Sequence, residues 1–169
     1  MKGREVAFAG LFAALTAVGA QISIPIGEVP ITLQVLFVLL SGTILGARLG
    51  AISQLVYIIA GAVGFPVFAG LSGGLAVLYG PTGGYLMAFP IAAGIAGLFA
   101  EKRRLEYCIF GALVAIGVIY LLGWFRLGLF LHDFRKALLV GVVPFVVFDL
   151  IKAAVAVSVT GRVRRALSL

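Results

Sequence analysis

Two opposite charges, Asp149 and Lys152, stand three residues apart in the apolar stretch VPFVVFDLIKAAVAVSV (143–159). On a helix this spacing places both side chains on one face, where they can pair. One ion near the centre of a membrane helix costs roughly 2.5–3.5 kcal/mol on the insertion scale. The pair either neutralises itself and holds helices together, or faces an outward-open cavity and binds a polar or anionic ligand. Ionisable groups inside membranes are usually functional, which favours the ligand.

Other polar and aromatic residues are expected at the same level of the molecule. Gln21 and Ser23 end the first apolar segment, and Thr32 and Gln34 begin the second. The aromatic candidates for the walls of a pocket are Phe65, Phe68, Tyr79 and Tyr85. Apolar walls with a few placed polar groups are typical of small-molecule pockets, although Gln, Thr and Tyr are also ordinary residues of the membrane interface.

The composition predicts an integral membrane protein. Of 169 residues, 63% are hydrophobic and 11% charged, with a mean hydropathy of +1.22. Soluble domains carry about a quarter charged residues. The net charge of +7 is confined mostly to short clusters between apolar runs. That distribution is typical of a membrane protein rather than of a nucleic-acid-binding surface, so no nucleic-acid partner is expected.

Six apolar segments are long enough, or nearly so, to cross a bilayer as helices. They cover residues 6–24, 31–45, 49–63, 84–100, 107–125 and 144–160. The segment 134–143 fits either a short interfacial helix or the first turns of the sixth span. We found no repeat or linker, so the chain is expected to form a single all-α membrane domain, residues 1–169.

The basic residues set the expected orientation, because cytoplasmic loops carry an excess of Lys and Arg. Six spans place nine of them on one side: Lys2, Arg4, Arg48, Lys102, Arg103, Arg104, Arg162, Arg164 and Arg165. The opposite side receives three: Arg126, Arg135 and Lys136. Both termini are therefore expected in the cytoplasm.

The connection over residues 65–84, FPVFAGLSGGLAVLYGPTGG, is long, aromatic and rich in glycine. Non-helical backbone near a membrane must be buried in protein or line a watered cavity. We therefore expect this loop to form a lid or wall over a site on the outer face, with a passive connector as the alternative.

Chemistry other than binding finds little support in the sequence. A single cysteine, Cys108, and a single histidine, His132, exclude an internal disulfide and any multi-thiolate or histidine-rich metal site. GPTGG (80–84) lacks the Lys-Ser/Thr of a phosphate-binding loop, so an ATPase would have to come from a partner. No Ser–His or paired-carboxylate arrangement stands within the apolar segments, so an enzyme is not expected.

Ala9, Ala13 and Ala17 follow one another at four-residue intervals in the first segment. Small residues at this spacing let membrane helices approach closely. The stripe fits internal packing and a docking face for another membrane protein equally well.

Several of these stretches together resemble the BioY family, the biotin-specific S components of energy-coupling-factor (ECF) transporters. The resemblance covers nearly the whole chain and is carried by four stretches: VGAQISIPIGEVPITLQVLFVLLSGTILGARLGA, GAVGFPVFAGLSGGLAVLYGPTGGYL, GVIYLLG and PFVVFDLIKAA. It implies six helices with both termini inside, an outward pocket, and a multi-pass protein of a prokaryotic plasma membrane. It also implies biotin as ligand, a membrane scaffold (T) subunit and two ATPase subunits as partners, and no cofactor.

The resemblance also assigns roles to residues. It implies that Asp149 and Lys152 bind the ligand and that Ala9, Ala13 and Ala17 contact the scaffold. Asp149 would accept from the ureido N–H groups of biotin, while Lys152 would face the ureido oxygen or the carboxylate. The other expected ligand contacts are Tyr79, Gln34, Thr32, Phe68, Gly70, Gly73, Gly74 and Tyr85. Some members carry an asparagine after the third helix; this chain has none there, leaving Ser72, Tyr79 or a backbone group.

Two alternative functions stay open at this stage. The chain could be an S component for another vitamin, such as thiamine or riboflavin. It could also be a membrane assembly protein without a ligand, which would explain the alanine stripe but not the polar cluster around the charged pair.

Overall fold

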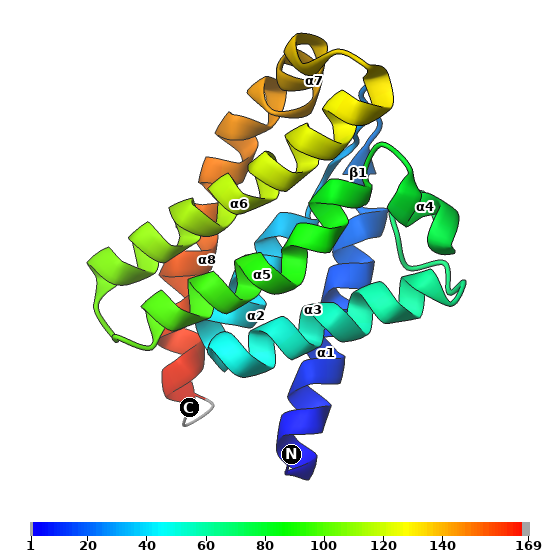
Figure 1. Ribbon diagram of the computed structural model, residues 1–169. Coiled ribbons are helices and arrows are strands. Elements are labelled where there is room, and N and C mark those ends of the chain that lie inside the picture. The colour runs from blue at the N-terminus through cyan, green and yellow to red at the C-terminus, as the bar shows by residue number, and fades with distance from the viewer. Residues whose placement is uncertain (1, 167–169) are drawn as a thin grey trace.

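A computed structural model describes residues 2–166 and is mostly helical (Figure 1). The described helices are α1 (Gly3–Gln21), α2 (Gln34–Leu45), α3 (Ala47–Ala62), α4 (Leu75–Tyr79), α5 (Gly83–Ala100), α6 (Leu105–Leu131), α7 (Phe134–Gly141), the 3-10 turn η1 (Val143–Phe145) and α8 (Val146–Ala166). Strands β1 (Ser23–Ile24) and β2 (Ile31–Thr32) form a small hairpin. The start of α1 and the last turn of α8 lie at one end of the molecule, and α7 lies at the other (Figure 1).

The segment between the first two apolar runs is an antiparallel hairpin rather than helix. Ser23 pairs with Thr32 and Ile24 with Ile31, so α1 ends at Gln21 and α2 begins at Gln34. Compared with the expected segments 6–24 and 31–45, α1 keeps its length but is shifted towards the N-terminus, and α2 is shorter. Pro25 and Pro30 have no N–H to continue a helical ladder, and strand pairing satisfies the backbone groups that remain.

Residues 126–136, which lie between the fifth and sixth expected segments, are mostly helical. α6 continues to Leu131 and α7 begins at Phe134, so Arg126 lies within a helix. The reversal needs only two residues: His132 adopts a left-handed φ of 54°, and Asp133 caps α7 by accepting from the N–H of Lys136 at 2.9 Å. Asp is a favoured N-cap, which explains why a second helix starts there. The segment left open at 134–143 is therefore largely a separate short helix, α7.

The remaining helices agree with the predicted segments to within a few residues, apart from α6 and from α8, which extends to Ala166. The residues 65–84 also contain the five-residue helix α4, which the sequence did not reveal.

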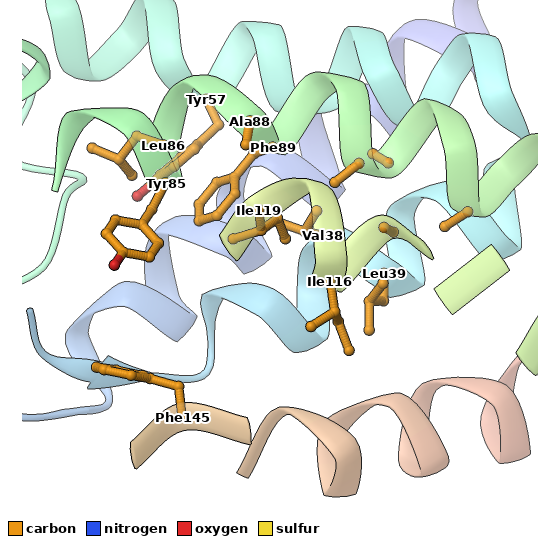
Figure 2. Close-up of a cluster of buried hydrophobic side chains, with 14 of the residues drawn as sticks. Val38, Leu39, Tyr57, Tyr85, Leu86, Ala88, Phe89, Ile116, Ile119 and Phe145 are labelled. Atoms are coloured by element: carbon orange, nitrogen blue, oxygen red, sulfur yellow. The ribbon is translucent and has the colours of Figure 1, made fainter. Parts of the chain in front are cut away.

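Helix α5 forms the centre of the bundle. In its apolar stretch 61% of residues are buried, against 28–39% in the other three long apolar helices. Its residues Ala88, Ala92 and Ala96 are 0% exposed and let α2, α3 and α6 approach closely. Val38, Leu39, Ile116 and Ile119 are buried in the same hydrophobic core as α5 (Figure 2).

Large apolar side chains cover the outside of the bundle as well. Val18 on α1, Ile59 on α3, Leu121 on α6 and Ile151 on α8 are all more than half exposed. Soluble monomers rarely expose such continuous apolar surface. Four stretches are long and apolar enough to cross a membrane: α1, α5, α6 and the α7–α8 region (Phe134–Ala166). The chain is therefore built to lie in lipid.

A buried glutamine joins three helices. The side chain of Gln54 on α3 is 0% exposed, and its Nε2 donates to Thr16 Oγ1 and Ser41 Oγ, each at 3.1 Å. Both hydroxyls also donate to carbonyls of their own helices. Each therefore keeps a hydrogen-bond partner when the Gln54 amide is removed. Interhelical hydrogen bonds in a bilayer contribute about 0.6 kcal/mol each.

Gln54→Leu is therefore expected to lower the free energy of unfolding by about 1 kcal/mol. Unfolding of purified protein in mixed micelles with increasing dodecyl sulfate measures this. Ser158→Ala is the control, because the exposed Ser158 hydroxyl bonds only Ala154 O of its own helix. A loss above about 3 kcal/mol would mean that Gln54 does more than join helices.

Candidate functional site

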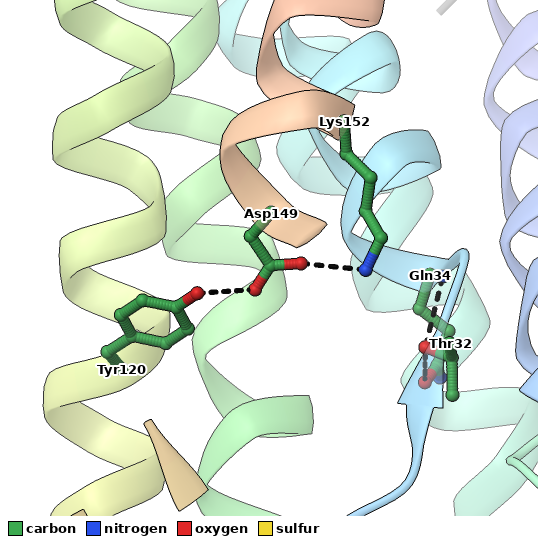
Figure 3. Close-up of polar contacts among 5 residues, drawn as sticks. All are labelled: Thr32, Gln34, Tyr120, Asp149 and Lys152. Atoms are coloured by element: carbon green, nitrogen blue, oxygen red, sulfur yellow. Dashed lines mark hydrogen bonds and ion pairs between the residues drawn. The ribbon is translucent and has the colours of Figure 1, made fainter. Parts of the chain in front are cut away.

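The charged pair lies in α8 and is buried. Asp149 is 2% exposed and Lys152 is 7% exposed, and Lys152 Nζ lies 2.7 Å from Asp149 Oδ1. The second carboxylate oxygen accepts from the hydroxyl of Tyr120 on α6 at 2.6 Å (Figure 3). The carboxylate is thus held from both sides, while the ammonium has further donors free to bind another acceptor.

A second polar group lies where the hairpin enters α2. Gln34 Oε1 accepts from Thr32 Oγ1 at 2.9 Å, and Gln34 Nε2 donates to the hydroxyl of Tyr57 at 2.6 Å. That hydroxyl donates to the carbonyl of Val67 at 3.0 Å. The short strand β2 and the first turn of α2 therefore fix both side chains. The Lys152 side chain points towards this group (Figure 3).

Aromatic side chains from three parts of the chain surround these polar groups. Phe68, in the loop after α3, is 1% exposed and packs edge-on against Tyr57 with ring centroids 5.5 Å apart. Tyr85, from α5, donates its hydroxyl to Gly141 O at 2.7 Å and so fixes α7 above the bundle. Phe145, from η1, points into the same region (Figure 2).

The side chain of Gln21 holds the loop against α1. Its Nε2 donates to the carbonyl of Phe68 at 3.0 Å, and its Oε1 accepts from the N–H of Leu71 at 2.9 Å. Leu71 has a left-handed φ of 53°, a conformation uncommon for residues other than glycine. One side chain at the end of α1 therefore clamps the loop in the position that buries Phe68.

The polar and aromatic groups enclose a cavity of about 160 Å³. One water needs only about 10–15 Å³ by a comparable measure, so the cavity is far larger than a packing defect. It is lined by Val29, Pro30, Thr32, Gln34, Val35, Phe68, Ala69, Ser72, Val77, Thr82, Tyr85, Leu86, Phe89, Ile119, Tyr120, Phe145, Asp149 and Lys152. Mostly apolar walls with one ion pair and a few hydroxyl and amide groups suit a small amphiphilic solute.

Six of the ten predicted ligand residues meet at this cavity: Asp149, Lys152, Thr32, Gln34, Phe68 and Tyr85. The loop 65–84 contributes further lining residues, which confirms the prediction that it borders a cavity. A cavity therefore lies beside the charged pair, and ligand binding by Asp149 and Lys152 stays a prediction.

The other four predicted residues lie outside the lining. Tyr79 is 72% exposed at the end of α4, and its carbonyl accepts from the Arg126 guanidinium. Gly70 and Gly74 have φ values of +70° and +94°, so they shape the turns of the loop. A side chain at Gly73 would meet the carbonyl of Phe65. As ligand contacts these four stay predictions.

Sequence reasoning missed Tyr120, Phe89, Ile119 and Phe145, all of which line the cavity. Tyr120 gave a signal that could have been used. A tyrosine in the middle of a membrane segment needs a partner for its hydroxyl, and Asp149 is the nearest expected acceptor at that level. Phe89, Ile119 and Phe145 are apolar residues in apolar segments, so the sequence gives no comparable signal for them.

The alanine stripe of α1 faces the protein itself. Ala9 and Ala13 are 3% and 7% exposed, and Ala17 is half-buried and packs against the core. Of the two interpretations left open, this arrangement favours internal packing, mainly against α3 and α2.

The fold and the cavity define a multi-pass helical membrane protein with a solute-sized cavity inside its bundle. The chain belongs to the BioY family, whose model matches residues 1–169. It is 54% identical over 164 residues to the probable biotin transporter BioY of Pyrococcus horikoshii, covering 97% of this chain and 98% of that protein.

Two further likenesses agree. The biotin transporter BioY of Thermotoga maritima is 48% identical over 163 residues, covering 96% of each chain. The crystal structure of the S-component for biotin from an ECF-type ABC transporter superposes with a TM-score of 0.83 at 26% identity, covering 97% of this chain and 92% of the other.

Proposed function

We propose that this chain is the substrate-binding S component of an ECF-type importer in a prokaryotic plasma membrane. It captures biotin on the outer face and delivers it inward together with a membrane scaffold (T) subunit and two ATPase subunits. The observation that carries the proposal is the Asp149–Lys152 pair beside a mostly apolar cavity. The full-length likeness to an S-component for biotin supports it.

The lining matches the chemistry of biotin group by group. Biotin has a ureido ring with two N–H donors and one carbonyl, a thioether ring and a valerate carboxylate. The Asp149 carboxylate accepts from the ureido N–H groups, and the Lys152 ammonium donates to the ureido oxygen or the carboxylate. Phe68, Tyr85 and Phe89 pack against the fused rings.

Of the candidates for the missing asparagine, Ser72 has the stronger support. It lines the cavity, whereas Tyr79 does not. The Ser72 hydroxyl donates to Ala69 O at 2.8 Å, which leaves its oxygen free to accept from a ligand. Gly70, Gly73 and Gly74 act in this proposal by giving the loop its shape.

The proposed topology has six spans, formed by α1, α2, α3, α5, α6 and α8, with both termini in the cytoplasm. The placing of the α1 start and the α8 end at one end of the molecule supports an even number of crossings (Figure 1). α2, with 12 residues, is only about 18 Å long. It therefore crosses together with the β1–β2 hairpin, which completes the path to the outer face.

The scaffold contact proposed for Ala9, Ala13 and Ala17 carries a structural condition. Because α3 and α2 cover this face in the isolated chain, α1 must shift or rotate to present it. Such a shift would couple scaffold binding to the hairpin and to the Gln21 clamp on the loop.

Equilibrium binding to detergent-purified protein tests the ligand. We expect saturable, one-to-one binding of biotin by calorimetry, and no measurable binding of thiamine or riboflavin at the same concentrations. Binding of another vitamin in place of biotin would assign the chain to a different S-component class. Absence of any ligand-induced thermal stabilisation would favour an assembly protein instead.

Tyr120→Phe is expected to weaken biotin binding about 2- to 10-fold without loss of folding. The hydroxyl donates to Asp149 and orients its carboxylate, and one such hydrogen bond contributes about 0.5–1.5 kcal/mol. Calorimetry with Tyr107→Phe as control measures the effect, because Tyr107 lies at the far end of α6 outside the cavity. Equal affinities for Tyr120→Phe and the parent protein would remove Tyr120 from the site.

A further inference from the structure

A second cavity, about 360 Å³ in volume, lies at the opposite end of the bundle from the hairpin. It is formed where the α5–α6 turn meets the last turns of α8. Its lining is Ala100, Arg103, Arg104, Leu105, Cys108, Val157, Thr160, Gly161, Arg164 and Arg165. Four arginine residues thus line one cavity, and no acidic residue belongs to this described lining.

The arginines are placed by the backbone around them. Arg164 donates to the carbonyl of Ala100 at 3.0 Å, which ties α8 to the end of α5. Arg103 has a left-handed φ of 56°, which turns the chain sharply before α6. Arg104 pairs with Glu106 at 3.3 Å, but both side chains are 71% exposed, so this pair is weak. The cavity keeps a strong positive charge suited to a phosphate, which arginine binds in a bidentate manner.

An apolar groove of about 410 Å³ continues from this cavity between α6 and α8. The two share Leu105 and Val157, so they are contiguous. The groove is lined by Leu105, Ile109, Ala112, Leu113, Leu150, Ala153, Ala154, Val157 and Ser158. Its floor is made of small side chains, Ala112 and Ala153, which are 0% and 6% exposed, while Leu113 and Leu150 flank it as exposed walls.

We propose that the cavity and groove bind one anionic phospholipid. The phosphate lies among the arginines and one acyl chain lies in the α6–α8 groove. Basic cavities between membrane helices are typical sites for anionic head groups. A soluble phosphate would leave the groove empty, and an apolar partner helix would leave the arginine cavity without an anion. A phospholipid fills both, because its phosphate and its acyl chain are joined as the cavity and groove are joined at Leu105 and Val157. The inference does not depend on the identity of the solute in the other cavity.

Native mass spectrometry of the detergent-purified chain tests this site. The probes are dioleoyl phosphatidylglycerol, dioleoyl phosphatidylcholine with the same acyl chains, and glycerol 3-phosphate as a head group without chains. We expect phosphatidylglycerol to be retained at about tenfold lower concentration than phosphatidylcholine, and glycerol phosphate not to be retained. Equal retention of the two lipids would overturn the proposal.

Charge variants locate the site. Arg103→Gln/Arg164→Gln is expected to weaken phosphatidylglycerol retention about 10- to 30-fold. Arg135→Gln/Lys136→Gln removes the same charge at the other end of the bundle and should have no effect. Arg104→Gln/Arg165→Gln leaves the Arg164–Ala100 bond intact and gives a second test should the first variant fold poorly. Retention unchanged in both cavity variants would overturn the proposal.

A groove variant separates a lipid from its alternatives. Ala154→Phe fills the groove and is expected to weaken phosphatidylglycerol retention at least about threefold, whereas Val147→Phe, on α8 outside the groove, should not. An effect of the arginine variants without any effect of Ala154→Phe would indicate a head-group site only. Co-purification of the same variants with the scaffold subunit is the second measurement. If these variants lost the scaffold but retained phosphatidylglycerol as the parent protein does, the site would be a protein interface. Either result would overturn the proposal.

Discussion

Asp149→Asn is expected to lower the affinity for biotin about 10- to 100-fold while the protein remains folded. Losing one charge-assisted hydrogen bond at a buried site costs about 1.5–3 kcal/mol, and each 1.4 kcal/mol is tenfold in affinity. The carboxylate is held at 2.7 Å from Lys152 Nζ and 2.6 Å from the Tyr120 hydroxyl. An asparagine can accept through only one oxygen. Its NH2 group must therefore face a donor, which is Lys152, Tyr120 or a ureido N–H group, and one hydrogen bond is lost.

Calorimetric titration of biotin into the purified variant measures this effect. Asp133→Asn is the matched control, because it makes the same chemical change at the N-cap of α7, outside the cavity. Asparagine is also a good N-cap, so the control should retain both stability and affinity. Biotin affinity within twofold of the parent in Asp149→Asn would refute the proposed role of the carboxylate.

The residues that sequence reasoning found are those that contrast with their surroundings. Asp149 and Lys152 are conspicuous because charge within an apolar segment is costly and rare. Thr32 and Gln34 were found because they follow Pro30 at the expected start of the second span. The contact of Gln34 with Tyr57 was not expected, since it depends on a hydrogen bond across 23 residues.

The apolar part of the cavity could not be predicted in the same way. Phe89, Ile119 and Phe145 belong to segments that are apolar on every face, so hydropathy does not separate residues facing a cavity from residues facing lipid. Only the packing of α5 against α6 and η1 decides which side chains face inward. The same limit applies to α1, where spacing alone left internal packing and docking equally open for Ala9 and Ala13.

The helix ends show a different limit. Apolar composition placed the fifth segment at 107–125, whereas α6 extends to Leu131. Arg126 was placed beyond the fifth segment on the outer side, yet its backbone is helical and its guanidinium donates to the carbonyl of Tyr79. Hydropathy shows which segments are apolar, whereas the length of a helix depends on its caps and on contacts between distant segments.

Replacing both charges at once separates a structural pair from a ligand site. Removing one partner of a buried ion pair is expected to destabilise the fold by about 3–5 kcal/mol, because the other charge is left uncompensated. Replacing both partners with apolar residues of similar volume is often neutral or stabilising. Asp149→Leu/Lys152→Met should therefore be at least as stable as Asp149→Leu alone.

Biotin binding should behave in the opposite way. The double variant loses two charge-assisted interactions of about 1.5–3 kcal/mol each, so its affinity should fall more than about 100-fold although the fold is intact. Unfolding in dodecyl sulfate micelles and calorimetry on the same preparations give the two quantities, with Asp149→Leu and Lys152→Met completing the cycle. If the pair served only to hold helices together, the double variant would be stable and would bind biotin with nearly the affinity of the parent protein. Because stability and affinity are predicted to separate, the two roles of the pair can be distinguished even if both exist.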